Sequence, residues 1–113
     1  MGAKVLGVIR GLGTTYADGT ERMEIHVKLG KAKPLPHAMN ARIPVLLDIT
    51  GTLYQGGVRA TPNNLYVWIC PDITTLFSER RKLAHTLTAA GFHKNDQVCL
   101  DVDGGSITVC AAN

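Results

Sequence analysis

Arginine, asparagine and threonine gather in two separate stretches of the chain, and these residue types can recognise nucleic acid. Arginine binds phosphates or the edge of guanine, and asparagine can bind the edge of adenine through two hydrogen bonds. The candidate residues are Arg10, Thr14, Thr15, Tyr16, Arg22, Arg59, Thr61, Asn63 and Asn64. The same residue types are common in turns and on solvated surfaces, so the residues alone leave these two interpretations equal.

A segment without acidic residues lies between these two stretches. No aspartate or glutamate occurs between Glu24 and Asp48. The cations of the same interval are Lys28, Lys31, Lys33 and Arg42. They would widen a positively charged footprint for a polyanion. The formal net charge of +3 is compatible with a polyanionic partner but does not establish one.

The other chemically active residues do not form a catalytic or metal-binding motif. The three cysteines lack a CxxC pair, and the four histidines occur in none of the HxH, HExxH or HxxxH spacings. The stretch from Gly11 to Thr15 lacks the lysine of a phosphate-binding loop. Asp101 and Asp103 could hold a cation only weakly. We therefore expect no catalytic residue, no metal site and no cofactor.

The composition is that of a folded globular domain. The chain has 113 residues, of which 45% are hydrophobic and 19% charged. No run approaches the about 18 apolar residues that a membrane-spanning helix needs. Lys4 and Arg10 interrupt the apolar start that a secretory signal would require. An odd number of cysteines is typical of free thiols in a reducing compartment. We expect one cytoplasmic domain over residues 1–113, without a membrane partner.

Alternation of apolar and polar residues predicts seven β-strands. Their ranges are 4–10, 23–29, 42–49, 52–60, 65–70, 97–103 and 106–111. The first strand is apolar on both faces, which favours burial on both sides. Gly11 to Gly13 and Gly56-Gly57 suggest bulges. Asp18-Gly19 predicts a two-residue hairpin turn, and Thr50-Gly51 predicts another tight turn.

The last two strands predict their own register. A two-residue turn at Gly104-Gly105 pairs Asp103 with Ser106 and places the apolar residues of both strands on one face. The same register sets Cys99 opposite Cys110, at a separation that a disulfide can span. Packing of cysteine as a small apolar residue is the simpler explanation of this pair.

One helix is predicted at about residues 76–90. Leu76, Leu83, Leu87 and Ala90 fall on one apolar stripe with a period near 3.6. Thr75 or Ser78 could cap its start, and Gly91 followed by Phe92 suits a left-handed end. The chain is therefore expected to be mainly β (α+β), with seven strands and one main helix.

The order of these elements resembles the DNA-binding pseudobarrel superfamily. That superfamily includes plant transcription-factor domains, effector-binding domains of some restriction endonucleases, and AbrB-type regulators. The likeness lies in LAHTLTAAGFHKNDQVCLDVDGGSITV, residues 83–109, about a quarter of the chain. Asn95-Asp96-Gln97-Val98 stands where such sequences often have Gly-Asp-x-Val. The resemblance implies a seven-stranded open β-barrel, the pseudobarrel.

The resemblance also implies a way of binding. In the plant and endonuclease members, two arms grip the major groove of DNA. The corresponding stretches here are residues 11–21, the first arm, and residues 59–64, the second arm. Asp18 and Glu21 depart from this pattern, because they place negative charge in the first arm.

We therefore expect a non-catalytic module that binds duplex DNA through basic and polar loops at one rim of the barrel. Arg10, Arg22 and Arg59 would contact phosphates or guanine, and Asn63 and Asn64 would read bases. A homodimer or a larger protein complex is compatible with this role. The alternative is a small barrel that binds a protein partner or a small ligand. Its Tyr54, Tyr66 and Trp68 would line the site, although such aromatic residues are more often part of a core. An enzyme of unrecognised type is a third possibility.

Overall fold

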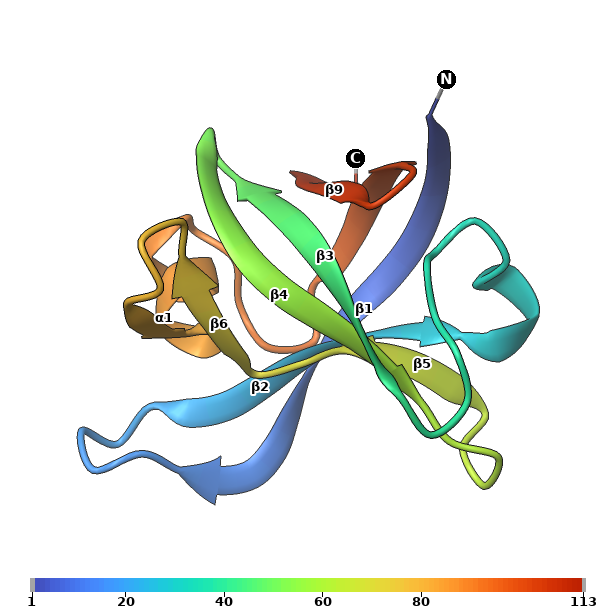
Figure 1. Ribbon diagram of the computed structural model, residues 1–113. Helices are drawn as coiled ribbons and strands as arrows, with labels where there is room; N and C mark the ends of the chain where they lie inside the picture. Colours follow the sequence, from blue (N-terminus) through green and yellow to red (C-terminus); the bar gives the residue numbers. More distant parts are fainter. Residues whose placement is uncertain (1, 113) are drawn as a thin grey trace.

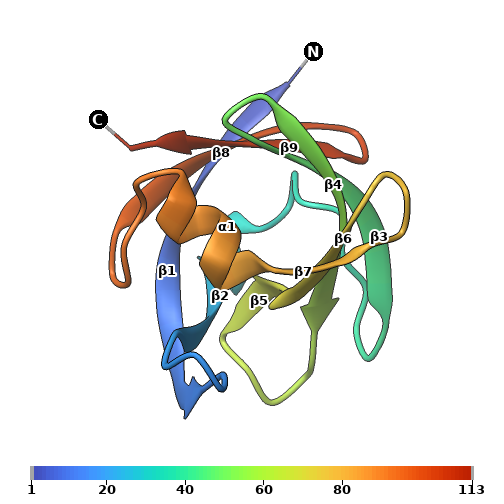
Figure 2. The same cartoon turned by 90° about the vertical axis from the view of Figure 1, so that its left-hand side faces the viewer.

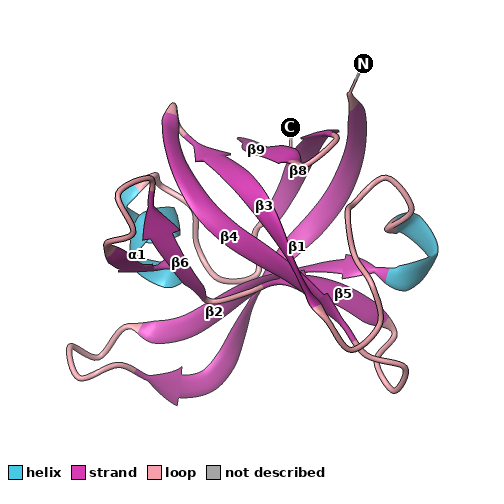
Figure 3. Cartoon of the chain, viewed as in Figure 1, coloured by secondary structure: helices cyan, strands magenta, loops and turns pink. Residues whose placement is uncertain are grey.

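The computed structural model describes residues 2–112, which fold mainly into β-strands (Figures 1 and 3). The helical elements are the 3₁₀ helix η1 (Leu29–Lys31) and the α-helix α1 (Leu83–Ala89). The strands are β1 (Ala3–Thr15), β2 (Glu21–Lys28), β3 (Arg42–Ile49), β4 (Thr52–Ala60), β5 (Tyr66–Ile69), β6 (Asp72–Thr75), β7 (Arg80–Lys82), β8 (Gln97–Asp103) and β9 (Ser106–Ala111).

Seven of the strands close into a barrel. They follow the order β3-β9-β8-β1-β2-β5-β4, and β4 pairs again with β3 to complete the ring. Neighbouring strands of the ring are antiparallel except β3 and β9, which are parallel. In Figure 2 the strands surround the interior and α1 lies in front of it. The predicted seven-stranded barrel with a single α-helix is confirmed, but the ring is closed rather than open, because β3 pairs with β4.

The core fills the inside of this ring. Successive side chains of a strand point to opposite faces, so every second residue enters the interior. Helix α1 packs against β2 and β7 and adds Leu83 and Leu87 to the core. The fully buried strand residues include Ile9, Ile25, Leu47, Val58, Ile69, Leu100 and Ile107. The prediction that the first strand is buried on both faces is wrong, because Leu6 on its outer face is 52% exposed.

The β1–β2 hairpin is longer than predicted. Strand β1 continues past Gly11 to Thr15, and its register against β2 shifts in that interval, which confirms the expected bulge. The backbone carbonyl of Tyr16 accepts a hydrogen bond from the Gly19 N–H at 3.0 Å. The Tyr16 N–H donates to the carbonyl of Thr20 at 2.9 Å. Gly19 has a φ of 87° whereas Asp18 has a negative φ. The turn therefore has three residues and ends at a left-handed glycine, instead of the predicted two-residue turn.

The glycines of β4 mark a change of partner rather than a bulge. Residues 58–60 of β4 pair with β5, whereas Tyr54 and Gln55 pair with β6. The register against β3 continues through Gly56 and Gly57 without a shift. A Cβ atom on Gly56 would lie 2.6 Å from Leu47 Cδ1. Glycine is thus required at position 56, because the Leu47 side chain packs directly against the backbone of β4 there.

The predicted helix over 76–90 begins too early. Residues 72–75 and 80–82 instead form the β6–β7 hairpin, and α1 starts at Leu83. Leu83 and Leu87 are fully buried as expected, but Leu76 is 49% exposed. The cause is local: the Thr75 hydroxyl accepts from the N–H groups of Phe77 and Glu79, which closes a turn where the helix was expected.

Local sequence signals predicted the end of α1 and the β8–β9 turn correctly, but not the end of β2. Gly91 has a φ of 90°, and the Phe92 N–H donates to Leu87 at 2.9 Å, which confirms the left-handed helix end. The predicted β8–β9 register is confirmed at every pair from Asp103–Ser106 to Cys99–Cys110. Leu29, in contrast, was expected on the core face of the second strand. It starts η1 and is 37% exposed.

Candidate nucleic-acid interface

The two arms leave the barrel at opposite ends of β2, not side by side at one rim as the sequence led us to expect. At one end Glu21 pairs with Thr15, next to the tip of the first arm. At the other end Lys28 pairs with Tyr66, directly after the second arm. The seven residue steps between Glu21 and Lys28, at about 3.3 Å each, separate the arms by about 23 Å along the strand. Both arms project toward the lower side of the barrel in Figures 1 and 2.

The outer surface of the barrel between the arms is called the inter-arm face here. Because residues paired across strands share a face, His26, Trp68 and Arg59 form one row across β2, β5 and β4. The row continues to Val8 on β1 and Arg42 on β3. The outward side chains of the inter-arm face are Arg22, Glu24, His26, Lys28, Arg59, Tyr66 and Trp68.

Three aromatic rings form the centre of the inter-arm face. The rings of His26 and Tyr66 stack with centroids 4.0 Å apart and an interplanar angle of 12°. Trp68 meets Tyr66 edge-on at 5.8 Å. Tyr66 and Trp68 are half-buried on the outside of the barrel, since Val67 and Ile69 point inward. The expectation that they belong to the core is wrong, whereas Tyr54 does pack partly against the core.

Several cations of the inter-arm face have no carboxylate partner. Among residues 2–112, no ion pair or side-chain hydrogen bond forms at Arg22, Lys28 or Arg59. The Nε atom of Arg22 is buried without a hydrogen-bond partner in the described chain. Glu24 is the one acid on this face, and its Oε1 lies 2.9 Å from His26 Nε2. The charge of these arginines and of Lys28 is therefore available to an external anion.

Lys31, Lys33 and Arg42 extend the positive surface beyond the inter-arm face. Lys31 ends η1 and Lys33 follows it, and both are exposed beside the second arm, where the Leu29 N–H donates to Leu65. The Arg42 guanidinium donates to the Asp72 carbonyl at 3.3 Å. Burial raises the pKa of the Cys70 thiol, while the nearby charges of Arg42 and Arg59 act in the opposite direction.

The acids of the first arm are paired with basic residues. Asp18 Oδ2 lies 2.9 Å from His85 Nε2 on α1, and Glu21 Oε1 lies 2.8 Å from Lys94 Nζ. Hydrogen bonds from the backbone and hydroxyl of Thr20 lower the pKa of Asp18, and His85 adds to this effect. The Lys94 hydrogen bond, with that of the Gly13 N–H, lowers the pKa of Glu21. The charge of Glu21 is thus balanced by Lys94, whereas Asp18 is balanced only when His85 is protonated.

Other first-arm candidates contact the protein itself. The Tyr16 ring packs against His85 with centroids 5.4 Å apart, and the Lys82 ammonium lies 5.2 Å from the ring centroid. Arg10 Nη1 donates to Asn95 Oδ1 at 3.2 Å. Thr14 and Thr15 are exposed at the end of β1. Tyr16 therefore anchors the arm to α1, and the threonines are its accessible polar side chains.

In the second arm, one asparagine shapes the turn and the other faces solvent. Asn64 Nδ2 donates to Thr61 Oγ1 at 2.7 Å, and the Asn64 N–H donates to the Thr61 carbonyl at 3.2 Å. Asn63 is exposed, as is Leu65 at 84%. Within residues 2–112, the Asn63 amide makes no hydrogen bond, so it can act as donor and acceptor toward a ligand.

One residue of the site, His26, was missed by sequence reasoning. Its ring stack with Tyr66 was not predicted either. The signal that could have found it is the alternation Tyr66-Val67-Trp68-Ile69, in which the two aliphatic residues mark the inner face. Once β5 is known to pair with β2, this alternation places both aromatic residues beside His26.

Comparison with known proteins gives no match: no family model, no curated protein and no solved structure is similar to the chain. Neither helix of the described region is long and apolar enough to cross a membrane. Within residues 2–112, no three His, Cys, Asp or Glu side chains come together as metal ligands. The geometry and charge of the inter-arm face are the features of the described chain that bear on function.

Proposed function

We propose that the protein is a non-catalytic module that binds duplex DNA across the inter-arm face, with one arm on each side. The observation that carries this proposal is the asymmetry of ion pairing. Arg22, Lys28 and Arg59 are without carboxylate partners in the described chain, whereas Glu21 is paired with Lys94, and Glu24 and Asp18 each contact a histidine. A polyanion approaching this face therefore meets unpaired positive charge.

The cations would provide affinity and the arms would provide discrimination. Arg22, Lys28 and Arg59 contact phosphates directly, and each neutralised phosphate releases bound counterions. Lys31, Lys33 and Arg42 widen the footprint. Asn63 lies on the second arm and Arg10 lies directly before the first, and hydrogen bonds from these side chains to base edges would give sequence preference. Few contacts of this kind give weak binding that falls steeply with salt.

A salt-dependent binding experiment tests this proposal. A labelled mixed-sequence duplex is titrated with the wild-type protein and with the Arg59→Ala, Asn63→Ala double variant at several salt concentrations. Loss of one phosphate contact should flatten the slope of log affinity against log salt by about 0.9. Lys4→Ala is the matched control, since Lys4 is an exposed lysine of β1 that pairs with Asp101, away from β5. Absence of binding by the wild type at low salt would remove the proposal.

A second candidate is the binding of single-stranded nucleic acid on the same face. It is favoured by the partly exposed rings of Tyr66 and Trp68, beside which His26 stacks, because every base can stack on an aromatic side chain. The two candidates differ in what Trp68 does. In a single-strand complex it carries a base, whereas in a duplex complex the bases remain stacked on one another.

A further inference from the structure

A group of apolar side chains is exposed at the β6–β7 turn and the adjoining start of β4. Phe77 is 89% exposed, Leu76 49% and Leu53 38%. Together with Tyr54 they line a hollow of about 550 Å³. Single exposed apolar residues are normal, but a contiguous group beside a hollow marks an interaction surface. This group, with Glu79 and Arg81, is called the Phe77 surface.

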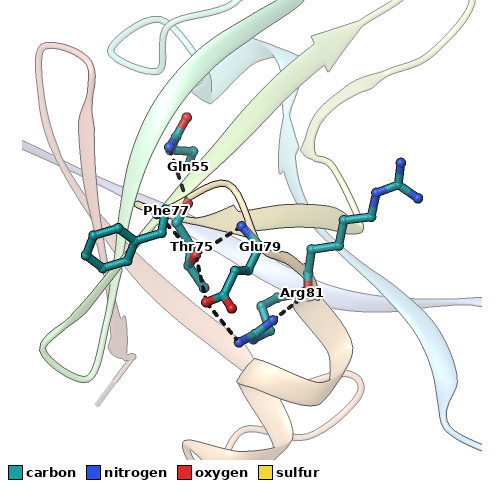
Figure 4. A network of polar contacts seen from close by, with 6 residues as sticks. Gln55, Thr75, Phe77, Glu79 and Arg81 are labelled. Atoms are coloured by element: carbon teal, nitrogen blue, oxygen red, sulfur yellow. Dashed lines mark hydrogen bonds and ion pairs between the residues drawn. The ribbon is translucent and has the colours of Figure 1, made fainter.

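The turn that carries Phe77 is held in a fixed shape (Figure 4). The Thr75 hydroxyl accepts from the N–H groups of Phe77 and Glu79, each at 3.2 Å. Gln55 Nε2 donates to the Thr75 carbonyl at 3.2 Å. Ser78 adopts a left-handed conformation with a φ of 65°. In Figure 4 the Phe77 ring points away from this network, so the turn presents an ordered apolar side chain to solvent.

Both signs of charge flank the apolar group. Glu79 Oε1 lies 3.5 Å from Arg81 Nη2, and the two side chains are 61% and 49% exposed. An exposed ion pair at this distance contributes little to the stability of the folded chain. The same patch thus contains a protruding ring, a hollow, an anion and a cation.

We propose that the Phe77 surface binds the same surface of a second copy of this chain, giving a two-fold symmetric dimer. A two-fold interface requires one patch that complements itself. The ring of Phe77 from each copy enters the hollow of the other, and Glu79 of each faces Arg81 of the other. A partner carrying only one sign of charge would leave one of these two residues facing like charge.

The dimer leaves the inter-arm face open. In Figures 1 and 2 the β6–β7 turn lies on the upper part of the barrel, whereas both arms project from the lower side. The inference is therefore independent of the proposed function. The Phe77 surface has far fewer residues than the about 20 to 30 per side of a standard stable interface, so the dimer should dissociate on dilution.

Sedimentation velocity over a range of protein concentrations tests the dimer. The wild type should shift from monomer to dimer as its concentration rises. Phe77→Asp should weaken the dimer at least about 30-fold, which is the usual effect of removing a central aromatic anchor. Leu65→Asp is the matched control, because Leu65 is 84% exposed directly after the second arm and its variant should dimerise normally. Circular dichroism confirms that each variant is folded.

Charge reversal tests the two-fold arrangement. Glu79→Arg and Arg81→Glu should each weaken the dimer, because like charges then meet across the axis. An equimolar mixture of the two variants should dimerise again, since each copy supplies the charge that the other lacks. A monomeric wild type at all concentrations, a dimer that persists in Phe77→Asp, or a mixture that stays monomeric would each overturn the proposal.

Discussion

Lys94 donates a hydrogen bond to Glu21 over 2.8 Å between Nζ and Oε1, although the two residues are 73 positions apart. The bond joins the base of the first arm to the connection between α1 and β8. Glu21 also accepts from the Gly13 N–H at 3.0 Å, inside the same arm. One carboxylate therefore holds both the shape of the arm and its attachment to the barrel.

Replacing Lys94 with methionine should raise the pKa of Glu21 toward its ordinary value of 4.5. The folded state lowers this pKa, so the bridge stabilises the protein above the pKa of the unfolded chain and is lost as the pH falls through the folded value. The stability difference between wild type and variant should thus shrink on acidification. Carbon-detected NMR titration of Glu21 measures the shift, and an unchanged pKa contradicts this account of the arm.

Tyr16 makes a separate prediction, because its ring and its hydroxyl act oppositely. The ring contacts His85, but the hydroxyl is buried without a hydrogen-bond partner among the described residues. Tyr16→Phe should therefore raise the free energy of unfolding by about 1 kcal/mol. Tyr16→Ala, which also loses the ring, should lower it by about 3 kcal/mol. Urea denaturation of both variants is the measurement, and a destabilised phenylalanine variant would mean that the hydroxyl is hydrated or bonded.

Local sequence signals were sufficient where glycine fixed the turn. Gly104-Gly105 allowed one register that puts all apolar residues of β8 and β9 on the same face, and that register was confirmed. The β6–β7 hairpin lacked such a signal. Its turn, Leu76 to Glu79, contains no glycine, proline or asparagine, and it is closed by the hydroxyl of Thr75. The apolar stripe of the real helix could be extended through it without conflict.

The site was harder to predict because its features depend on long-range pairing. The alternation within β5 marks its inner face, but the residues that lie beside its outer face are decided by its pairing with β2, which the sequence does not show. The sequence likewise placed Asp18 and Glu21 as unfavourable charges in the first arm. Their partners His85 and Lys94 come from the last third of the chain, so these contacts could not be predicted from the sequence.

The close crossing at Gly56 predicts a sharp difference between two glycines. Gly56→Ala places a methyl group 2.6 Å from Leu47 Cδ1 and should destabilise the barrel by about 1 to 3 kcal/mol. Gly30→Ala is the control, because a Cβ there meets nothing within 4 Å and its φ is not in the left-handed region. It should change stability by less than about 1 kcal/mol. Equal effects in thermal denaturation would mean that the close packing of Leu47 on β4 is not the reason for glycine at this position.

The three free cysteines should differ in reactivity. Cys110 is exposed, while Cys70 is buried and its pKa is raised by that burial. The thiolate is the reactive form, so a thiol reagent at neutral pH should label Cys110 rapidly and Cys70 only after unfolding. Mass spectrometry of the labelled peptides gives the order. Rapid labelling of Cys70 in the folded protein would mean that the β5–β6 region opens readily.

Cys99 and Cys110 form a directly opposed pair on β8 and β9. Hydrogen-bonded and non-hydrogen-bonded pairs alternate from Asp103–Ser106 onward, so Cys99 and Cys110 form a hydrogen-bonded pair. The Cα atoms of such a pair lie about 5.5 Å apart, which is within the Cα range of disulfides. Mild oxidation with diamide should therefore remove two thiols per chain and join these two peptides. Cys99→Ser is the control, and it should give no intramolecular crosslink. Persistence of all three thiols in the oxidised wild type would contradict the prediction.

Trp68 decides between the two nucleic-acid ligands, and it is the single tryptophan of the chain, so its fluorescence reports on this position alone. If the ligand is duplex DNA, Arg59→Ala should weaken binding more than Trp68→Ala, because phosphate contacts carry the affinity. If a single strand is the ligand, loss of one stacked base should weaken binding by about 1 to 3 kcal/mol in Trp68→Ala. We expect the first result, with little quenching of Trp68 by a duplex. Strong quenching by an oligothymidine together with a dominant effect of Trp68→Ala would assign the face to single strands instead.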